Sequence, residues 1–237
     1  MIKLENTEIF GWEAAIRGAR NPMNSWDKSD SYWDWWEDPS PINPCDEPRF
    51  FVGENDLKLM KNLSKAGSDH GKYLRYLIVQ LDITAPFYWW KEFKTYRKGR
   101  KFMDDGDELL DPEEFEMFIE TNSCSTMHKI HAQPFGISDF SIDQLNCDVP
   151  DCFYDTLDYL NESREKFLET KDKKYWWRMI QLLPSSYNQK RTVQLNYQVL
   201  KSMYHARKNH KLDEWREFCK WCESLPYFKE ICIDVYN

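Results

Sequence analysis

One line of side chains in the segment NYQVLKSMYHARKNH, residues 196–210, combines two polar ends with an apolar middle. A helix would place four of these residues on one face, because they follow one another at intervals of four, three and four. They are Asn196, Leu200, Met203 and Arg207. The two apolar side chains would anchor the helix in a core, while an amide and a guanidinium would emerge at its ends. A guanidinium binds phosphate through charge-assisted, often bidentate hydrogen bonds, so this line predicts a site for a phosphate-bearing ligand.

The charge pattern around Arg207 also favours an anionic ligand. No acid stands between Asp172 and Asp213, whereas nine bases occupy that interval and would draw phosphate. Two alternatives stay open: an ordinary solvated basic face, or a buried Arg207 guanidinium paired with an acid from elsewhere in the chain. The whole chain carries a net charge of −8, which argues against binding to the backbone of DNA or RNA.

The elements that would position these residues are mostly helices. Apolar periodicity predicts helices over 12–20, 55–66, 138–146, 152–169, 172–183, 192–209 and 211–223, and another after Pro86. Residues 73–83 contain the best strand of the chain. We therefore expect a single α/β domain over residues 1–237, rich in helices and with a small central sheet.

Two segments do not fit this helical pattern. Residues 22–50 hold four tryptophans among prolines and show no periodicity, which indicates an ordered loop packed on the body or on a neighbouring subunit. Stacking of a nucleobase on these tryptophans is the alternative. Residues 98–121 are strongly acidic, and we interpret them as a surface insertion.

The sequence also excludes several classes of site. No Gly-rich phosphate loop is present, so Walker-type and Rossmann sites are excluded. We expect no metal site, because Cys219 and Cys222 form a CxxC without a second ligand pair and are better explained as buried structural thiols. The chain has no basic, apolar leader and no run long enough for a membrane span, and its odd count of seven cysteines fits a reducing cytoplasm.

The segment LLPSSYNQKRTVQLNYQVLKSMYHARKNHKLDEW, residues 182–215, resembles the C-terminal signature of the flavin-dependent thymidylate synthases. That signature has a Leu-Pro turn, an Asn at the entry of a helix, then a Leu, and an Arg three helical turns after the Asn. Here Leu183 and Pro184 match the turn, while Asn196 and Arg207 match the amide and the arginine with the family's spacing of eleven. By this resemblance, Asn196 contacts flavin and Arg207 holds the phosphate of dUMP.

A second segment, TAPFYWWKEFKTYR at 84–97, resembles the part of the same family that runs from a proline to an Arg-His-Arg triplet. In the family this triplet grips the flavin. Here it falls on Thr95, Tyr96 and Arg97, so only the last arginine is kept.

Further matches and departures lie on both sides of that segment. NSCSTMHKI, residues 122–130, aligns Ser125 with the family's serine, and DHGKYLRY aligns His70 with its leading histidine. Gln198 and Ser202 stand where the family usually has a second Arg and a second Asn. The resemblance is therefore spread over most of the chain in the family's order.

The resemblance implies a helix-rich α/β fold and a set of candidate site residues. The nucleotide or phosphate candidates are Arg207, Lys211, Ser125 and Arg97. The cofactor candidates are Asn196, His70, Arg97 and Gln198, and Ser125 is also the catalytic candidate. The implied reaction makes dTMP from dUMP with FAD, NADPH and methylenetetrahydrofolate, in a homotetramer whose sites lie between subunits.

Two functions from different classes remain open. The chain is a diverged enzyme of nucleotide biosynthesis, or it is a catalytically inactive protein of the same fold that binds a nucleotide. The second resembles a phage-type protein that sequesters a nucleotide signal, with the phosphate-holding half kept and the flavin grip lost. A purely structural protein would leave the line from Asn196 to Arg207 unexplained.

Overall fold

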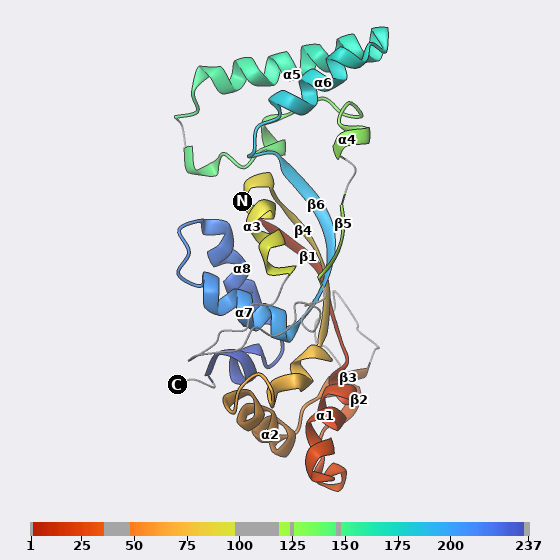
Figure 1. The fold of residues 1–237 in the computed structure, drawn as a ribbon, viewed down its shortest axis with the longest axis vertical. Coiled ribbons are helices and arrows are strands. Elements are labelled where there is room, and N and C mark those ends of the chain that lie inside the picture. Colours follow the sequence, from red (N-terminus) through yellow and green to blue (C-terminus); the bar gives the residue numbers. More distant parts are fainter. Residues whose placement is uncertain (1, 36–47, 98–118, 124–125, 146–147, 235–237) are drawn as a thin grey trace, which may run out of the picture. The chain divides into compact units, whose positions relative to one another are not determined.

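A computed structural model describes residues 2–35, 48–97, 119–123, 126–145 and 148–234 (Figure 1). The strands are β1 (Lys3–Phe10), β2 (Tyr32–Trp35), β3 (Pro48–Phe51), β4 (Ile78–Pro86), β5 (Glu120–Ser123) and β6 (Asn188–Asn196). The helices are α1 (Trp12–Arg20), α2 (Glu54–Lys65), α3 (Phe87–Phe93), α4 (Thr126–Lys129), α5 (Asp151–Thr170), α6 (Lys173–Leu182), α7 (Tyr197–Arg207) and α8 (Asp213–Ser224). The predicted helix-rich α/β fold with a small sheet is confirmed.

The larger sheet has four strands in the order β1-β4-β6-β5. β4 and β6 run antiparallel, because contacts that advance along one strand retreat along the other. The Gln80 amide donates to Gln194 at 2.7 Å, and two residues further on Asp82 accepts from Thr192, also at 2.7 Å. Every second residue of each strand is buried, so one face of the β4–β6 pair belongs to the core and the other is polar.

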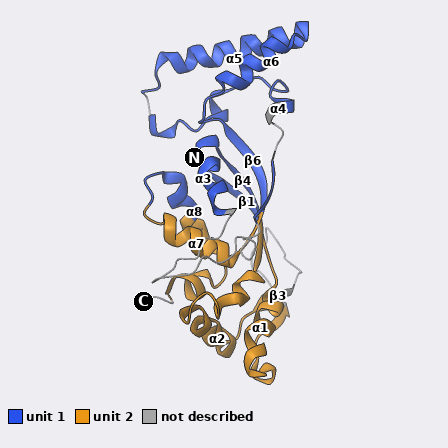
Figure 2. Cartoon of the chain, in the orientation of Figure 1, with its two compact units in different colours: residues 1–7, 81–193, 210–218 blue, residues 8–80, 194–209, 219–237 orange. Residues whose placement is uncertain are grey.

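The described chain divides into two compact units, each built from three separated segments (Figure 2). The first comprises Met1–Thr7, Leu81–Val193 and His210–Phe218, and the second Glu8–Gln80, Gln194–Asn209 and Cys219–Asn237. The single domain expected over residues 1–237 stays a prediction.

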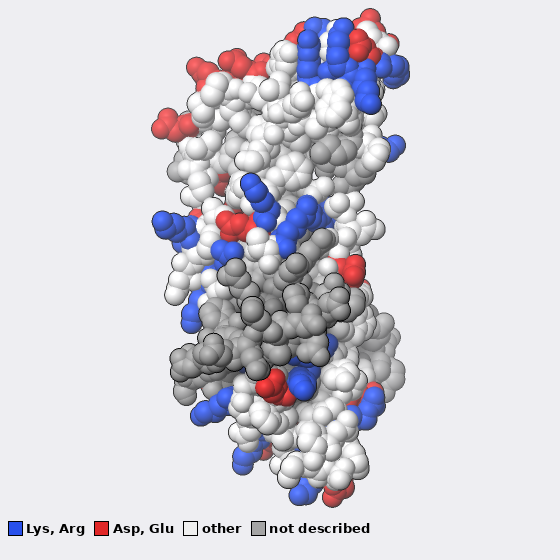
Figure 3. All heavy atoms as spheres, in the orientation of Figure 1, with Lys and Arg blue, Asp and Glu red and all other residues white. Residues whose placement is uncertain are grey.

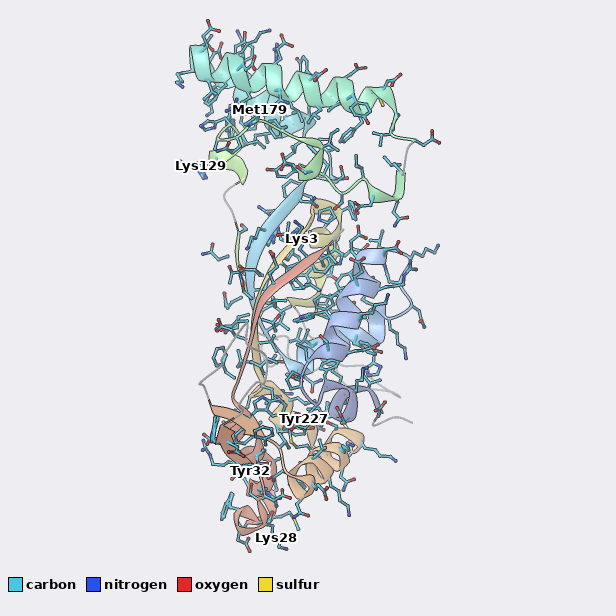
Figure 4. The ribbon with its side chains drawn as sticks, turned by 180° about the vertical axis from the view of Figure 1, so that it is seen from behind. Lys3, Lys28, Tyr32, Lys129, Met179 and Tyr227 are labelled. Carbon is cyan, nitrogen blue, oxygen red and sulfur yellow. The ribbon has the colours of Figure 1, made fainter. Side chains whose placement is uncertain are left out.

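Aromatic packing forms one core of the first unit. Trp89, Trp90 and Phe93 of α3 are buried, and the Trp89 ring lies 4.8 Å from that of Trp215, centre to centre, at the start of α8. Nearby, the Tyr88 hydroxyl bonds the buried Glu214 carboxylate. A second cluster joins α5 and α6 to the segment before them, and Met179, labelled in Figure 4, is one of its members.

The second unit is held by a buried ion pair as well as by apolar packing. The Arg20 Nε of α1 lies 2.6 Å from Asp56 Oδ1 of α2, and both side chains are almost inaccessible. Arg20 also donates to the main-chain carbonyls of Ser25 and Lys28, at 3.0 and 2.8 Å. The other Asp56 oxygen accepts hydrogen bonds from the 29–31 segment, so this pair fixes the chain between α1 and β2.

A close approach explains why α1 begins after a glycine. Gly11 has a φ of +94°, which favours glycine, and a Cβ added there would lie 2.0 Å from the main-chain oxygen of Tyr76. Any other residue at this position would push α1 away from the 71–76 turn.

Most of the predicted helices are confirmed. These are 12–20, 55–66, 152–169, 172–183, 211–223 and the helix after Pro86. The helix predicted over 192–209 is wrong in its first part, because β6 continues to Asn196 and α7 begins only at Tyr197. The helix predicted over 138–146 is also wrong, since the chain there forms two separate 3₁₀ turns, Ile137–Asp139 and Asp143–Leu145.

Three other expectations need correction or fall outside the described residues. The strand predicted over 73–83 starts at Ile78, after a 3₁₀ turn over Gly71–Arg75. The tryptophan-rich segment 22–50 is not purely loop, because its described parts include β2 and the start of β3, which pair antiparallel. In the acidic segment 98–121, residues 98–118 lie outside the described residues.

Candidate functional site

Helix α7 carries the line of four residues singled out in the sequence. Leu200 and Met203 are fully buried, as expected for the residues that anchor the helix. Asn196 precedes the first turn and Arg207 is the last helical residue, so they stand about 16 Å apart along the axis. The structure thus places Asn196 and Gln198 at the start of α7, where β6 ends, and Arg207 at the far end of the same helix (Figure 1).

Asn196 has a structural task in this arrangement. Its side-chain oxygen accepts a hydrogen bond from the main-chain N–H of Val199 at 3.0 Å, which makes it the N-cap of α7. The side chain is 8% exposed. The amide NH₂ group is not used in this bond, so it is the part of Asn196 that a ligand would meet.

Arg207 is partly exposed at the carboxyl end of α7. A cation is favoured there, because the last carbonyl groups of a helix carry partial negative charge. Two residues earlier, His205 Nε2 lies 2.9 Å from the main-chain oxygen of Cys232. Burial lowers the pKa of His205 below its usual value, so this imidazole is neutral at pH 7 and leaves the positive charge of the helix end to Arg207 and Lys208.

Gln198 and His70 are the two other candidates in or near α7. Gln198 is partly exposed, and its main-chain oxygen accepts a hydrogen bond from the Ser202 hydroxyl at 3.1 Å. His70 is exposed in the turn before Gly71–Arg75, and that short helix packs against α7 and α1 within the same unit. Their cofactor roles stay predictions.

The sequence did not single out Lys201 of α7, which is only 7% exposed. Its neighbour Leu200 is fully buried, and no apolar period marks the next position as part of the core. A buried lysine is uncommon in proteins, so Lys201 is a further polar residue of α7 beside the candidates found from the sequence.

Two of the three residues aligned with the family's triplet, Thr95 and Tyr96, make internal contacts. The Thr95 hydroxyl donates to the main-chain oxygen of Glu92 at 2.7 Å. The Tyr96 ring packs edge-on against Trp215, with 5.9 Å between centroids. Arg97 ends the short helix Lys94–Arg97, and its side chain lies outside the described residues.

Ser125 and Lys211 are the remaining candidates. Ser125 lies outside the described residues, directly before α4, so neither its catalytic nor its phosphate role is tested. Lys211 is exposed in the segment between α7 and α8. Arg97, Ser125 and Lys211 belong to the first compact unit, and the α7 residues to the second.

Two cations of the basic interval 173–211 have partners within the fold. Lys190 lies 3.0 Å from Asp82, whose pKa is lowered to about 2 by hydrogen bonds from Thr192, Asn6 and Lys190. The guanidinium of Arg191 lies 4.3 Å from the centre of the Trp90 ring and is buried. Both cations therefore make contacts within the sheet and its packing. The prediction of an anion site depends on the bases in and after α7, among them Arg207 and Lys211.

The CxxC cysteines are part of the core in the described structure. Cys219 and Cys222 are free, buried thiols, and burial raises the pKa of Cys219 to about 12, as expected for unreactive core residues. No group of three or more His, Cys, Asp or Glu side chains suited to a metal occurs in the described parts of the chain. No helix of those parts is both long enough and apolar enough to cross a bilayer.

Known structures decide the fold. A crystal structure of the flavin-dependent thymidylate synthase of Helicobacter pylori, complexed with FAD and dUMP, superposes with a TM-score of 0.63. It covers 98% of this chain and 99% of that one, at 14% sequence identity. The chain has the fold of a flavin-dependent thymidylate synthase.

A second structure of the Helicobacter pylori enzyme with FAD and dUMP agrees, with the same TM-score and 99% of each chain covered. No protein-family model matches the sequence, and no curated protein matches it either. The likeness is therefore one of fold, carried by packing rather than by shared residues, and function has to be argued from the site.

Proposed function

We propose that the chain binds a pyrimidine nucleoside monophosphate of the dUMP type, with Arg207 as a phosphate contact. The observation that carries this proposal is the placement of Arg207, partly exposed at the end of a helix whose Leu200 and Met203 are fully buried. The fold supports it, because the matching Helicobacter pylori structures hold dUMP.

The physical basis is the strength of a guanidinium–phosphate contact. Such a charge-assisted bond contributes about 1.5–3 kcal/mol, which corresponds to roughly tenfold to a hundredfold in affinity. Lys211, Ser125 and Arg97 are proposed as further phosphate contacts. Gln198 is proposed to contact the ligand beside Asn196 at the other end of α7.

Thermal unfolding with dUMP and with deoxyuridine tests the proposal. A ligand that binds only the folded protein raises the melting temperature, and the rise grows with concentration. We expect dUMP to raise it, and deoxyuridine, which lacks the phosphate, to raise it less at equal concentration. Equal effects of the two compounds, or no effect of either, would contradict the proposal.

Flavin-dependent methylation of dUMP is the second candidate function. It is favoured by the extent of the fold match, which covers nearly the whole chain. The reaction would require FAD, NADPH and methylenetetrahydrofolate, in a homotetramer located in the cytoplasm. His70, Asn196, Gln198 and Arg97 are proposed as its cofactor contacts, with Ser125 as the catalytic residue.

The residues around the triplet position do not fit a flavin grip. Thr95 and Tyr96 make contacts within their own unit, and neither supplies a cation for the flavin phosphates. We therefore derive no catalytic step through FAD. This disagreement favours a nucleotide-binding protein without turnover, such as one that sequesters a nucleotide.

The visible spectrum of the purified protein separates the two functions. Flavin bands in the purified protein, or bands that stay with the protein after FAD is added and the excess removed, would support the enzyme. We expect a colourless protein that ignores FAD and is still stabilised by dUMP.

A further inference from the structure

Two side-chain hydrogen bonds tie the carboxyl end of α7 to the last part of the chain. The Tyr204 hydroxyl donates to the Glu223 carboxylate of α8 at 2.8 Å. His205 Nε2 lies 2.9 Å from the main-chain oxygen of Cys232. Both bonds lie within the second compact unit, and both start from the last turn of α7, which ends at Arg207. Any movement of this turn therefore moves Arg207.

The bond made by His205 fixes the form of its imidazole. A carbonyl oxygen only accepts hydrogen bonds, so the hydrogen is on Nε2 and His205 is the donor. Cys232 is fully buried, and a buried carbonyl that loses its donor is costly. The ring of His205 also meets the Tyr204 ring edge-on, with 5.5 Å between the centroids. The imidazole is thus held both by its nitrogen and by its ring.

The segment that presents the Cys232 carbonyl has an uncommon backbone. Lys229–Ile233 is a π-helical turn, and Tyr227 before it has a φ of +55°, a left-handed value that a bulky residue rarely adopts. The Tyr227 hydroxyl accepts a hydrogen bond from the main-chain N–H of Val52 at 3.2 Å. Strained backbone persists only where surrounding contacts hold it, and it is concentrated at functional sites. The end of α7 is therefore tied to a segment of defined conformation.

Two ties on adjacent residues fix the rotation of the last turn as well as its position. Successive side chains of an α-helix point about 100° apart, so Tyr204 and His205 hold the turn from two directions. Arg207 follows His205 by two residues and leaves the helix on nearly the opposite side. A turn that cannot rotate presents the Arg207 guanidinium in one direction.

A phosphate contact depends on that direction. A guanidinium binds phosphate best through two parallel N–H groups, so the contact weakens when its plane is turned away. Helix α7 has 11 residues, a length at which an isolated helix is only marginally stable, so its end depends on tertiary contacts. Figure 3 shows basic side chains exposed beside the connection between α7 and α8. The orientation of this helix end thus decides how Arg207 meets an anion.

We propose that His205 is a positioning residue for the phosphate contact of Arg207. Its hydrogen bond to the Cys232 carbonyl holds the last turn of α7 in the rotation that aims the guanidinium at the phosphate. This inference rests on the proposed binding of a nucleoside monophosphate. His205 itself needs no contact with the ligand, so its effect falls on the preference for a phosphate and not on the binding of the base and sugar.

Three substitutions at His205 separate a positioning role from a structural one. His205→Gln keeps an N–H donor at the same number of bonds from the main chain as Nε2, so the tie to Cys232 can form again. His205→Asn carries the same amide one bond short, and His205→Leu keeps apolar bulk without a donor. Calorimetric titration of each full-length protein with dUMP and with deoxyuridine gives two Kd values, and their ratio is the phosphate preference.

The two variants without the tie should lose part of the phosphate preference. We expect His205→Asn and His205→Leu to reduce it by about threefold to tenfold, less than the loss of the whole Arg207 contact. Their Kd for deoxyuridine should stay within about twofold of the wild type, and His205→Gln should keep the preference within the same margin. Thermal unfolding without ligand measures the stability of each protein, so the two kinds of loss can be compared.

Ser64→Ala is the matched control for a loss of stability. The hydroxyls of Ser64 and Tyr73 lie 2.7 Å apart, and both residues are buried in the same compact unit as α7 but outside that helix. Removal of this buried hydrogen bond should lower the melting temperature. It should leave the phosphate preference unchanged, because the last turn of α7 keeps both of its ties.

The inference is overturned if His205→Asn and His205→Leu keep the wild-type preference, or if His205→Gln loses as much of it as they do. It is equally overturned if both variants bind the two compounds more weakly by the same factor, or if neither of them folds, because His205 would then be structural. Arg207→Ala tests the proposed function separately. A wild-type preference that Arg207→Ala removes and the His205 variants keep rules out the positioning role alone, whereas a wild type without any preference rules out both.

Discussion

Arg207 and Asn196 mark the two ends of helix α7, and they offer a ligand different chemical groups. Asn196 uses its side-chain oxygen to cap the helix, whereas Arg207 presents a charged group at a helix end that favours cations. A ligand at the Asn196 end must therefore be met by the amide NH₂ group. At the Arg207 end, a phosphate would meet a permanent positive charge.

Arg207→Ala should weaken dUMP binding by about tenfold to a hundredfold, because a charge-assisted contact of about 1.5–3 kcal/mol is lost. The apo protein should still fold, since the residue is partly exposed. Lys208→Ala is the control, as it removes a neighbouring positive charge beyond the last helical residue. The measurement is the dUMP-induced rise in melting temperature. If the Arg207→Ala protein fails to fold, the arginine is structural and its assignment to phosphate is wrong.

Asn196→Ala should lower the free energy of unfolding by about 1 kcal/mol, because α7 loses its cap. Asn196→Asp should retain most of the stability, since a carboxylate caps equally well and suits a helix N-terminus. Urea unfolding of the two variants measures the difference. Equal stability of the Ala variant and the wild type would show that the cap contributes nothing. If the amide NH₂ also holds a ligand, the Asp variant should lose that ligand while it keeps its stability.

Elements of the second unit depend on the buried pair of Arg20 and Asp56. Burial raises the pKa of Asp56, but hydrogen bonds from Ser31 and Ser29 and the Arg20 guanidinium outweigh it, so the net pKa is lowered. A carboxylate with a lowered pKa stabilises the fold above its unfolded pKa of about 3.9, and this stabilisation is lost as the pH falls through the folded value.

Asp56→Asn should therefore destabilise the protein by about 3–5 kcal/mol near neutral pH, because it leaves a buried guanidinium without its anion. The difference between wild type and variant should narrow as the pH falls below about 4. The free energy of unfolding of both proteins, measured between about pH 3 and pH 7, checks this. The range extends from below the unfolded carboxyl pKa to neutral pH. A difference that stays constant across this range would mean that Asp56 is not charged in the folded protein.

The elements show which parts of the fold were predictable. Helices with a clear apolar face, such as 55–66 and 152–169, were predicted nearly to their ends. Only the end of β6, residues 192–196, was assigned to the predicted helix 192–209; its first part was not recognised as a strand, because its buried face carries Gln189 and Arg191 and disguises the alternation of apolar and polar residues. Arg191 is tolerated there because it lies over the Trp90 ring, a contact between distant segments that no local pattern reveals.

The candidate site was predictable only in part, for the same reason. The burial of Leu200 and Met203 could be predicted from their spacing within one helix, as could the position of Arg207 on the same helix. The buried position of Lys201 and the cap made by Asn196 depend on where β6 ends and on how α7 packs. Both features depend on tertiary packing, which the periodicity of a single segment does not predict.

The whole chain shares its fold with a flavin-dependent thymidylate synthase at 14% identity. A fold can be kept at this identity because many apolar sequences fill the same core, whereas a site depends on particular side chains. At the positions aligned with the family's triplet, Thr95 and Tyr96 make internal contacts. The molecule thus keeps the fold, while these two side chains differ from those expected at a flavin grip.

Calorimetric titration of the full-length protein with dUMP, and in parallel with deoxyuridine, tests the central claim most directly. If Arg207 and its neighbours hold a phosphate, dUMP should bind at least about tenfold more tightly than deoxyuridine, since one charge-assisted contact accounts for that ratio. The preference should disappear in Arg207→Ala. Equal affinities for the two compounds in the wild type, or an unchanged preference in the variant, would contradict the account.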